Sequence, residues 1–94
     1  MSESIPERLE KELKKLLGEA VPARAAYDLH AAIELAGLLE KKGFAFQLRD
    51  LCARSKTDTY WCATFCKDGE EFSAEDAGSS VAICTAAFAA LSNQ

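Results

Sequence analysis

The chain is poor in the residues that most enzyme sites require. Its 94 residues include a single histidine, and no glycine-rich phosphate-binding loop is present. Nucleophilic catalysis by serine or cysteine needs a nearby base and an orienting group. His30 lies beside a leucine stripe, where we interpret it as a surface or boundary residue. We therefore expect a protein that is not an enzyme.

Long apolar runs are also lacking. No run approaches the roughly 20 residues needed to span a bilayer, and the polar N-terminal segment lacks the apolar core of a signal peptide. We expect a cytoplasmic protein that makes no membrane contact.

Basic charge is scarce as well, because 11 lysines and arginines face 15 aspartates and glutamates, giving a net charge of -4. A protein that binds nucleic acid by neutralising phosphates needs the opposite balance, so we expect no direct nucleic-acid partner. The acidic balance suits a chain that imitates nucleic acid toward a basic protein. With 28% charged and 49% hydrophobic residues, the composition is that of one globular domain.

The four cysteines lie in apolar or strand-like surroundings, which favours structural thiols over reactive ones. Cys62 and Cys66 are four residues apart, so a strand would place them on one face at about 13 Å. That separation is too large for a disulfide or for one shared tetrahedral metal. We expect no metal and no cofactor.

Helical periodicity occurs in three segments. Residues 4–17 carry leucines at positions 9, 13, 16 and 17, which form one apolar stripe. Residues 24–41 form a second helix that ends before Gly43. Residues 78–91 form the last helix, which is uncharged and apolar nearly all round, as in helices buried on several sides. The rest of the domain is expected to surround this last helix.

Alternation with a period of two predicts strands at 44–49, 60–66 and 70–73, with an Asp68-Gly69 hairpin turn before the third strand. Such short connections require an antiparallel meander. The predicted class is α+β: an N-terminal amphipathic helix within residues 1–20, then a single α-β-β-β-α domain over residues 21–94. The helices at 24–41 and 78–91 should cover the sheet.

Both faces of the 60–66 strand carry large or soft residues, so its second face needs a cover. Either the N-terminal helix or another subunit could supply it. A homodimer is a reasonable hypothesis, since Tyr60, Phe88 and Leu91 exceed what a small core can enclose.

The order helix-strand-strand-strand-helix resembles double-stranded-RNA-binding domains, whose last helix shares small residues with this chain: Ala82, Ala86, Ala87, Ala90 and Leu91. The phosphate-gripping lysines of that family are replaced here by Ser79, Ser80 and Ile83. RNA recognition depends on such basic contacts, so this resemblance implies the topology without RNA binding.

A second resemblance covers residues 27–91 and concerns the small phage proteins of the phage ABA-sandwich family. The residues that carry it are Tyr27-Asp28, Ala31-Ala32, Lys42-Gly43-Phe44, Trp61-x-Ala63-x-Phe65, Glu70-Glu71-Phe72-x-Ala74 and Ala82-Ile83-Cys84-x-Ala86-Ala87. The chain departs from the family pattern at Ala25, at Ile33 and at Gly78-Ser79-Ser80. The resemblance implies a phage or prophage origin and a bacterial host cell, and it implies no chemical activity.

The sharpest charge feature is an acidic cluster, which consists of Asp68, Glu70, Glu71, Glu75 and Asp76. Its order does not match the alternating oxygen ligands of a calcium loop. The cluster can be a partner-binding surface, or a solvated sheet edge whose charges discourage strand-to-strand aggregation.

These observations favour a non-enzymatic phage accessory protein that binds a host protein, such as an anti-CRISPR-like inhibitor of a nucleic-acid-handling defence complex. The acidic cluster would contact the partner. An alternative is an oligomeric protein that sequesters a nucleotide, with a site built from Arg49, Arg54, Lys56 and Tyr60. A structural or assembly role in the virion is a third possibility.

Overall fold

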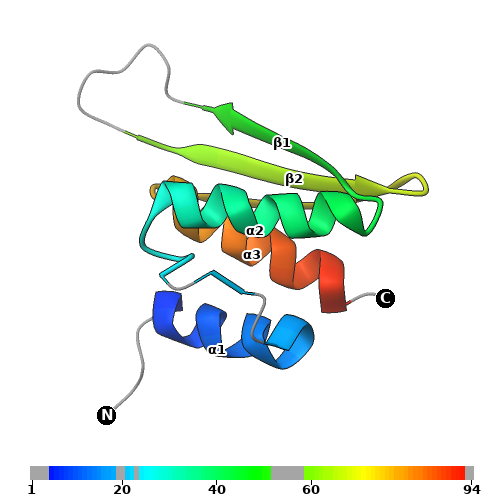
Figure 1. Ribbon diagram of the computed structural model, residues 1–94. Coiled ribbons are helices and arrows are strands. Elements are labelled where there is room, and N and C mark those ends of the chain that lie inside the picture. The colour runs from blue at the N-terminus through cyan, green and yellow to red at the C-terminus, as the bar shows by residue number, and fades with distance from the viewer. Residues whose placement is uncertain (1–4, 19–20, 23, 52–58, 93–94) are drawn as a thin grey trace.

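The computed structural model describes residues 5–18, 21–22, 24–51 and 59–92. It contains three helices and one sheet of three strands (Figure 1). In chain order the elements are α1 (Ile5–Leu17), α2 (Leu29–Lys41), β1 (Ala45–Asp50), β2 (Trp61–Lys67), β3 (Glu70–Asp76) and α3 (Ser79–Ser92). This confirms the predicted α+β class and the α-β-β-β-α order that follows the first helix.

The sheet is the antiparallel meander that the short connections require, with strand order β1-β2-β3. Its register places Phe46, Phe65 and Phe72 in one row across the three strands. Phe65, in the middle of this row, is fully buried. Phe44 adds edge-on contacts to Phe65 and Phe72, with ring centroids 6.4 Å apart in both cases. Alternation along the strands therefore gathers the aromatic core on one face of the sheet.

Helices α2 and α3 lie side by side on this aromatic face. Helix α3 packs on β2 and β3, whereas α2 packs on α3 and on β1. Four alanines of α3 are fully buried, and their small side chains let the helix approach its neighbours closely: Ala82, Ala86, Ala87 and Ala90. Helix α3 is thus enclosed by the sheet, by α2 and by α1, as its uniformly apolar sequence predicts.

Helix α1 forms a third layer, on the side of α3 that faces away from the sheet (Figure 1). Leu13 is its fully buried anchor. The Glu10 carboxylate also accepts a 3.3 Å hydrogen bond from the Ala26 amide, which ties α1 to the segment before α2. The expectation that this helix could cover the second face of the sheet is wrong, because α1 packs against α3 instead.

Two element boundaries differ from the sequence prediction by more than one residue. Helix α2 begins at Leu29 rather than near Arg24, because Arg24 adopts a left-handed conformation (φ 62°) that interrupts a helix. The Asp28 side chain then caps α2 by accepting the His30 amide at 3.0 Å. Strand β3 continues past Ser73 to Asp76, because the antiparallel pairing with β2 extends as far as Trp61.

Gly43 joins α2 to β1 in a conformation that favours glycine, with φ 100°. A Cβ at this position would lie 3.4 Å from Cε of Lys67. The Lys67 ammonium sits 5.1 Å from the centroid of the Phe44 ring, so its stem covers the end of the aromatic core. No helix within the described residues has the length and apolar character needed to cross a membrane.

Candidate functional site

The second face of the sheet carries no helix. We call it the open face, and alternation along the strands defines its members as Ala45, Gln47, Arg49, Cys62, Thr64, Cys66, Glu71, Ser73 and Glu75. All three helices lie on the other side of the sheet (Figure 1). The sequence predicts a cover for this face, and the described part of the chain supplies none.

The centre of the open face is a row of short side chains along β2. Cys62, Thr64 and Cys66 are all half-buried between the flanking strands. The Thr64 hydroxyl is 3.0 Å from the Ser73 hydroxyl, so these two groups hydrogen-bond to each other. Longer and charged residues lie on both sides, with Arg49 on β1 and with Glu71 and Glu75 on β3. The face therefore carries one positive charge on the β1 side and two negative charges on the β3 side.

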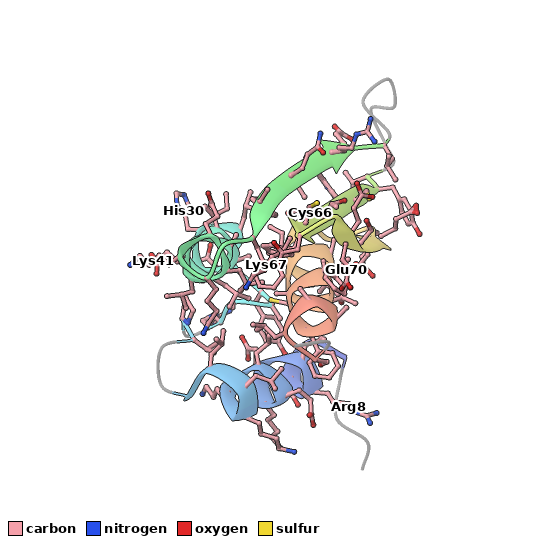
Figure 2. All side chains as sticks on the ribbon, turned by 90° about the vertical axis from the view of Figure 1, so that its right-hand side faces the viewer. Arg8, His30, Lys41, Cys66, Lys67 and Glu70 are labelled. Atoms are coloured by element: carbon pink, nitrogen blue, oxygen red, sulfur yellow. The ribbon has the colours of Figure 1, made fainter. Side chains whose placement is uncertain are left out.

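The acidic cluster predicted from the sequence lies along β3 and at the turn before it. Glu70, Glu71 and Glu75 are exposed, and Asp68 is exposed in the turn with φ 53°. Strand β3 is an edge of the sheet, so these carboxylates surround a row of unpaired backbone groups. Figure 2 shows Glu70 at the turn end of the sheet, far from Arg8 on α1.

The five acidic residues are not equivalent, and they do not converge on one point. Asp76 is half-buried, and its carboxylate accepts a 2.8 Å hydrogen bond from the Gly78 amide just before α3. It therefore has a structural task at the start of that helix. Glu71 and Glu75 lie on the open face, about 13 Å apart along the strand, whereas Glu70 and Asp76 belong to the opposite face.

The alternative ligand site is brought together only in part. Arg49 lies on the open face, and the backbone bond from the Leu51 amide to the Tyr60 carbonyl, 2.8 Å long, extends the strand pairing to Tyr60. Continued alternation places Tyr60 on the same face as Cys62. Arg54 and Lys56 lie outside the described residues. The described residues thus contribute one cation and one aromatic ring at this end of the sheet.

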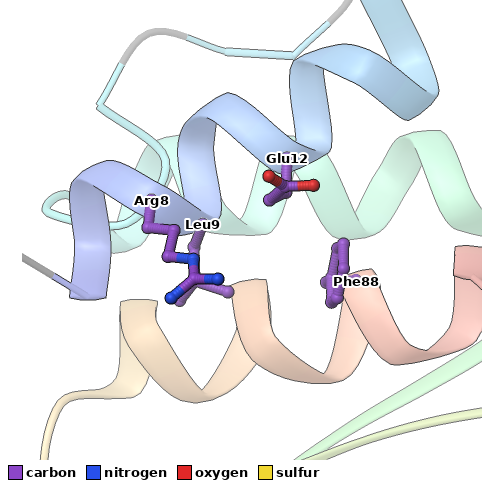
Figure 3. Close-up of a pocket in the computed structure, with 4 residues that line it drawn as sticks. All are labelled: Arg8, Leu9, Glu12 and Phe88. Carbon is purple, nitrogen blue, oxygen red and sulfur yellow. The ribbon is translucent and has the colours of Figure 1, made fainter. Parts of the chain in front are cut away.

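A groove of about 400 Å³ lies between α1 and α3 (Figure 3). Its lining residues are Arg8, Leu9, Glu12 and Phe88. Leu9 and Phe88 are half-buried, whereas Arg8 is exposed at the rim. Glu12 is engaged in an ion pair with Lys15 at 3.2 Å. The groove is the place where Phe88 remains partly accessible.

Of the three residues that motivate a homodimer in the sequence, Leu91 is buried within the chain, with 9% of its surface exposed. Tyr60 is 41% exposed and Phe88 is half-buried. Tyr60 and Phe88, the two of these residues that remain partly accessible, therefore lie in separate places, at the loop end of the open face and in the groove beside α1.

Cys84 is the most deeply buried thiol of the described cysteines. It lies in α3 with no exposed surface, and desolvation, together with the nearby Glu10 carboxylate, raises its pKa from 9.0 to about 12. His30 is exposed on α2, and Figure 2 shows it pointing away from α3. Within the described residues, no three histidine, cysteine or acidic side chains are grouped closely enough to hold a metal ion.

Comparison with known proteins identifies no relative. No family model, curated protein or solved structure matches this chain. The function is therefore argued from the geometry and charge of the described residues.

Proposed function

We propose that this protein acts by binding another protein, without catalysing a reaction, through the acidic surface formed by β3 and its turn. The observation that carries the proposal is the exposure of Glu70, Glu71 and Glu75 along one edge strand and of Asp68 in the turn before it. Carboxylates on an edge strand oppose indiscriminate pairing with other strands. They also give electrostatic complementarity to a basic partner, which speeds association and excludes acidic competitors.

The partner class follows from the charge and from the resemblance to phage proteins. A basic surface that normally holds nucleic acid is the natural complement of a row of exposed carboxylates. We therefore extend the proposal to a nucleic-acid-handling host complex, with this chain as an inhibitor of phage or prophage origin. The residues expected to contact it are Asp68, Glu70, Glu71 and Glu75. Asp76 contributes by holding the start of α3.

Charge reversal tests whether this surface, rather than another part of the molecule, binds the partner. The double variant Glu70→Lys/Glu71→Lys is compared with Glu34→Lys/Glu40→Lys, which reverses two exposed carboxylates on α2. Tagged chains are used to capture partners from lysates of bacteria that carry defence systems, and the captured proteins are quantified by mass spectrometry. We expect the α2 variant to capture a partner in a salt-sensitive complex. We expect the β3 variant to capture at least about tenfold less of the same partner.

Equal capture by both variants would rule out the acidic surface of β3 as the binding site. Thermal unfolding of each variant serves as the folding control, because surface substitutions of this kind change stability by about 0.5 kcal/mol or less. Loss of capture by both variants in parallel would show a response to net charge rather than to this surface, and it would contradict the proposal equally.

A further inference from the structure

The charges of the open face form a pattern that is complementary to itself. Arg49, Cys62 and Glu75 lie in one row across β1, β2 and β3. Ala45, Cys66 and Glu71 form a parallel row nearer the turn. The β1 side of the face therefore carries one positive charge, at Arg49, and the β3 side carries two negative charges, at Glu71 and Glu75, with an uncharged centre along β2.

We propose that the open face binds a second copy of this chain, with the two-fold axis running parallel to β2. A rotation about such an axis places β1 of one copy over β3 of the other. Because Arg49 and Glu75 occupy the same row, each Arg49 then lies opposite Glu75 of the second copy. The symmetry produces this ion pair twice.

In the alternative arrangement, the two-fold axis lies in the plane of the interface and is perpendicular to the strands. The same charges disfavour this arrangement. That rotation places β3 over β3 and exchanges the two rows. Glu75 would lie opposite Glu71 of the second copy, and Arg49 would lie opposite Ala45. Like charges facing each other across an interface are destabilising, so the charges select the axis parallel to β2.

The uncharged centre suits close packing of two sheets. Sheets pack face to face at about 10 Å with their strands nearly aligned, and the short side chains along β2 present no bulky obstacle. Thr64 and Ser73 hydrogen-bond to each other, so each hydroxyl keeps one partner when the face is covered. At the loop end, Tyr60 is 41% exposed and Leu51 is 47% exposed. A second copy would remove these apolar groups from water.

The face is small, and this limits the expected affinity. Three strands about 4.8 Å apart span a narrow strip, whereas a stable interface buries about 1,600 Å² in total. We therefore expect a reversible dimer that depends on its two ion pairs. Glu70 and Asp68 lie off the open face, so they remain accessible in the dimer. Glu71 and Glu75 belong to both surfaces, so the dimer and the partner proposed above compete for these two carboxylates.

The oligomeric state tests the proposal through a charge swap. Light scattering or sedimentation over a range of protein concentrations should show a monomer–dimer equilibrium. Arg49→Glu or Glu75→Arg should each weaken the dimer at least about tenfold, and the double variant should restore it. Glu34→Arg on α2 is the control and should leave association unchanged. A chain that is monomeric at every concentration, or a double variant that is not restored, would overturn the proposal.

Cross-linking tests the orientation. In a background with Cys52→Ser, one variant keeps Cys62 with Cys66→Ser, and the other keeps Cys66 with Cys62→Ser. A short bis-maleimide should cross-link each variant to itself, because the proposed axis sets Cys62 against Cys62 and Cys66 against Cys66. Cross-linking only in a mixture of the two variants would indicate the crossed arrangement and would overturn the proposed axis.

Discussion

Replacing Phe65 with alanine is expected to cost about 3–5 kcal/mol of the free energy of unfolding. Phe65 has no exposed surface, and it lies at the centre of the sheet between its register partners Phe46 and Phe72. Its ring contacts Phe46 with centroids 5.1 Å apart and meets Phe44 edge-on at 6.4 Å. Removing the ring leaves a cavity that strands held in hydrogen-bonded register cannot close.

Thermal and urea unfolding measure this loss. For a domain of this size, about 3 kcal/mol lowers Tm by at least roughly 12 °C. Phe46→Ala is the matched control, since it removes the same ring from a half-buried position on the edge strand β1. If Phe46→Ala lowers the free energy of unfolding as much as Phe65→Ala does, then β1 is covered as fully as β2, contrary to the structure.

Replacing Leu13 with alanine is the second substitution with a large expected effect, about 2–5 kcal/mol. Leu13 has no exposed surface, and it anchors α1 in the layer beneath α3. Leu16→Ala is the control on the same helix, because Leu16 is 44% exposed. We expect Leu16→Ala to lower the free energy of unfolding by less than about 1 kcal/mol. Both variants carry the same change in helix propensity, so the difference between them measures the packing of α1 on α3.

Chemical unfolding of the two leucine variants shows whether α1 belongs to the cooperative unit. If α1 is integral, Leu13→Ala shifts the whole transition. If Leu13→Ala and Leu16→Ala lower the free energy of unfolding by equally small amounts, α1 contributes little to the stability of the domain. That result would fit a helix that extends away from α3. A separate early transition in either variant would show α1 unfolding alone and would contradict a three-layer domain.

The strands and the central helix could be predicted because their sequence patterns report burial directly. Trp61, Ala63 and Phe65 alternate with Cys62 and Thr64, and the structure places the first three on the helix side of the sheet. The uncharged α3 is enclosed on several sides, as its composition predicts. Local periodicity thus determined the class and the topology.

The position of α1 could not be predicted, because an amphipathic stripe shows that one side of a helix is buried and does not show against what. Leu13 packs in the α3 layer rather than on the open face. The start of α2 was missed for a local reason, since nothing in the sequence indicated the left-handed Arg24 before the Asp28 cap.

The candidate site was predictable in composition but less so in arrangement. The acidic residues were found from their charge alone, yet only the strand register distributes Glu71 and Glu75 to the open face and Glu70 to the other. The task of Asp76 depends on a hydrogen bond to Gly78 that spacing alone does not reveal. Arg49 and Glu75 are distant in sequence, so their shared row emerges only from the pairing of both with Cys62.

All the described helices lie on one side of the sheet, so the other side should be accessible to reagents in solution. Thiol labelling tests it most directly, using a maleimide at neutral pH on dilute, monomeric Cys52→Ser protein, with mass-spectrometric mapping. Cys62 and Cys66 lie on the open face, whereas Cys84 is buried with a pKa raised to about 12.

At that pKa, the thiolate fraction of Cys84 is about a thousandfold lower than at the ordinary value of 9.0. We predict that Cys62 and Cys66 react in the folded protein and that Cys84 reacts only after unfolding in urea. Protection of all three thiols in the folded monomer would mean that the second face of the sheet is covered, and it would contradict an open face.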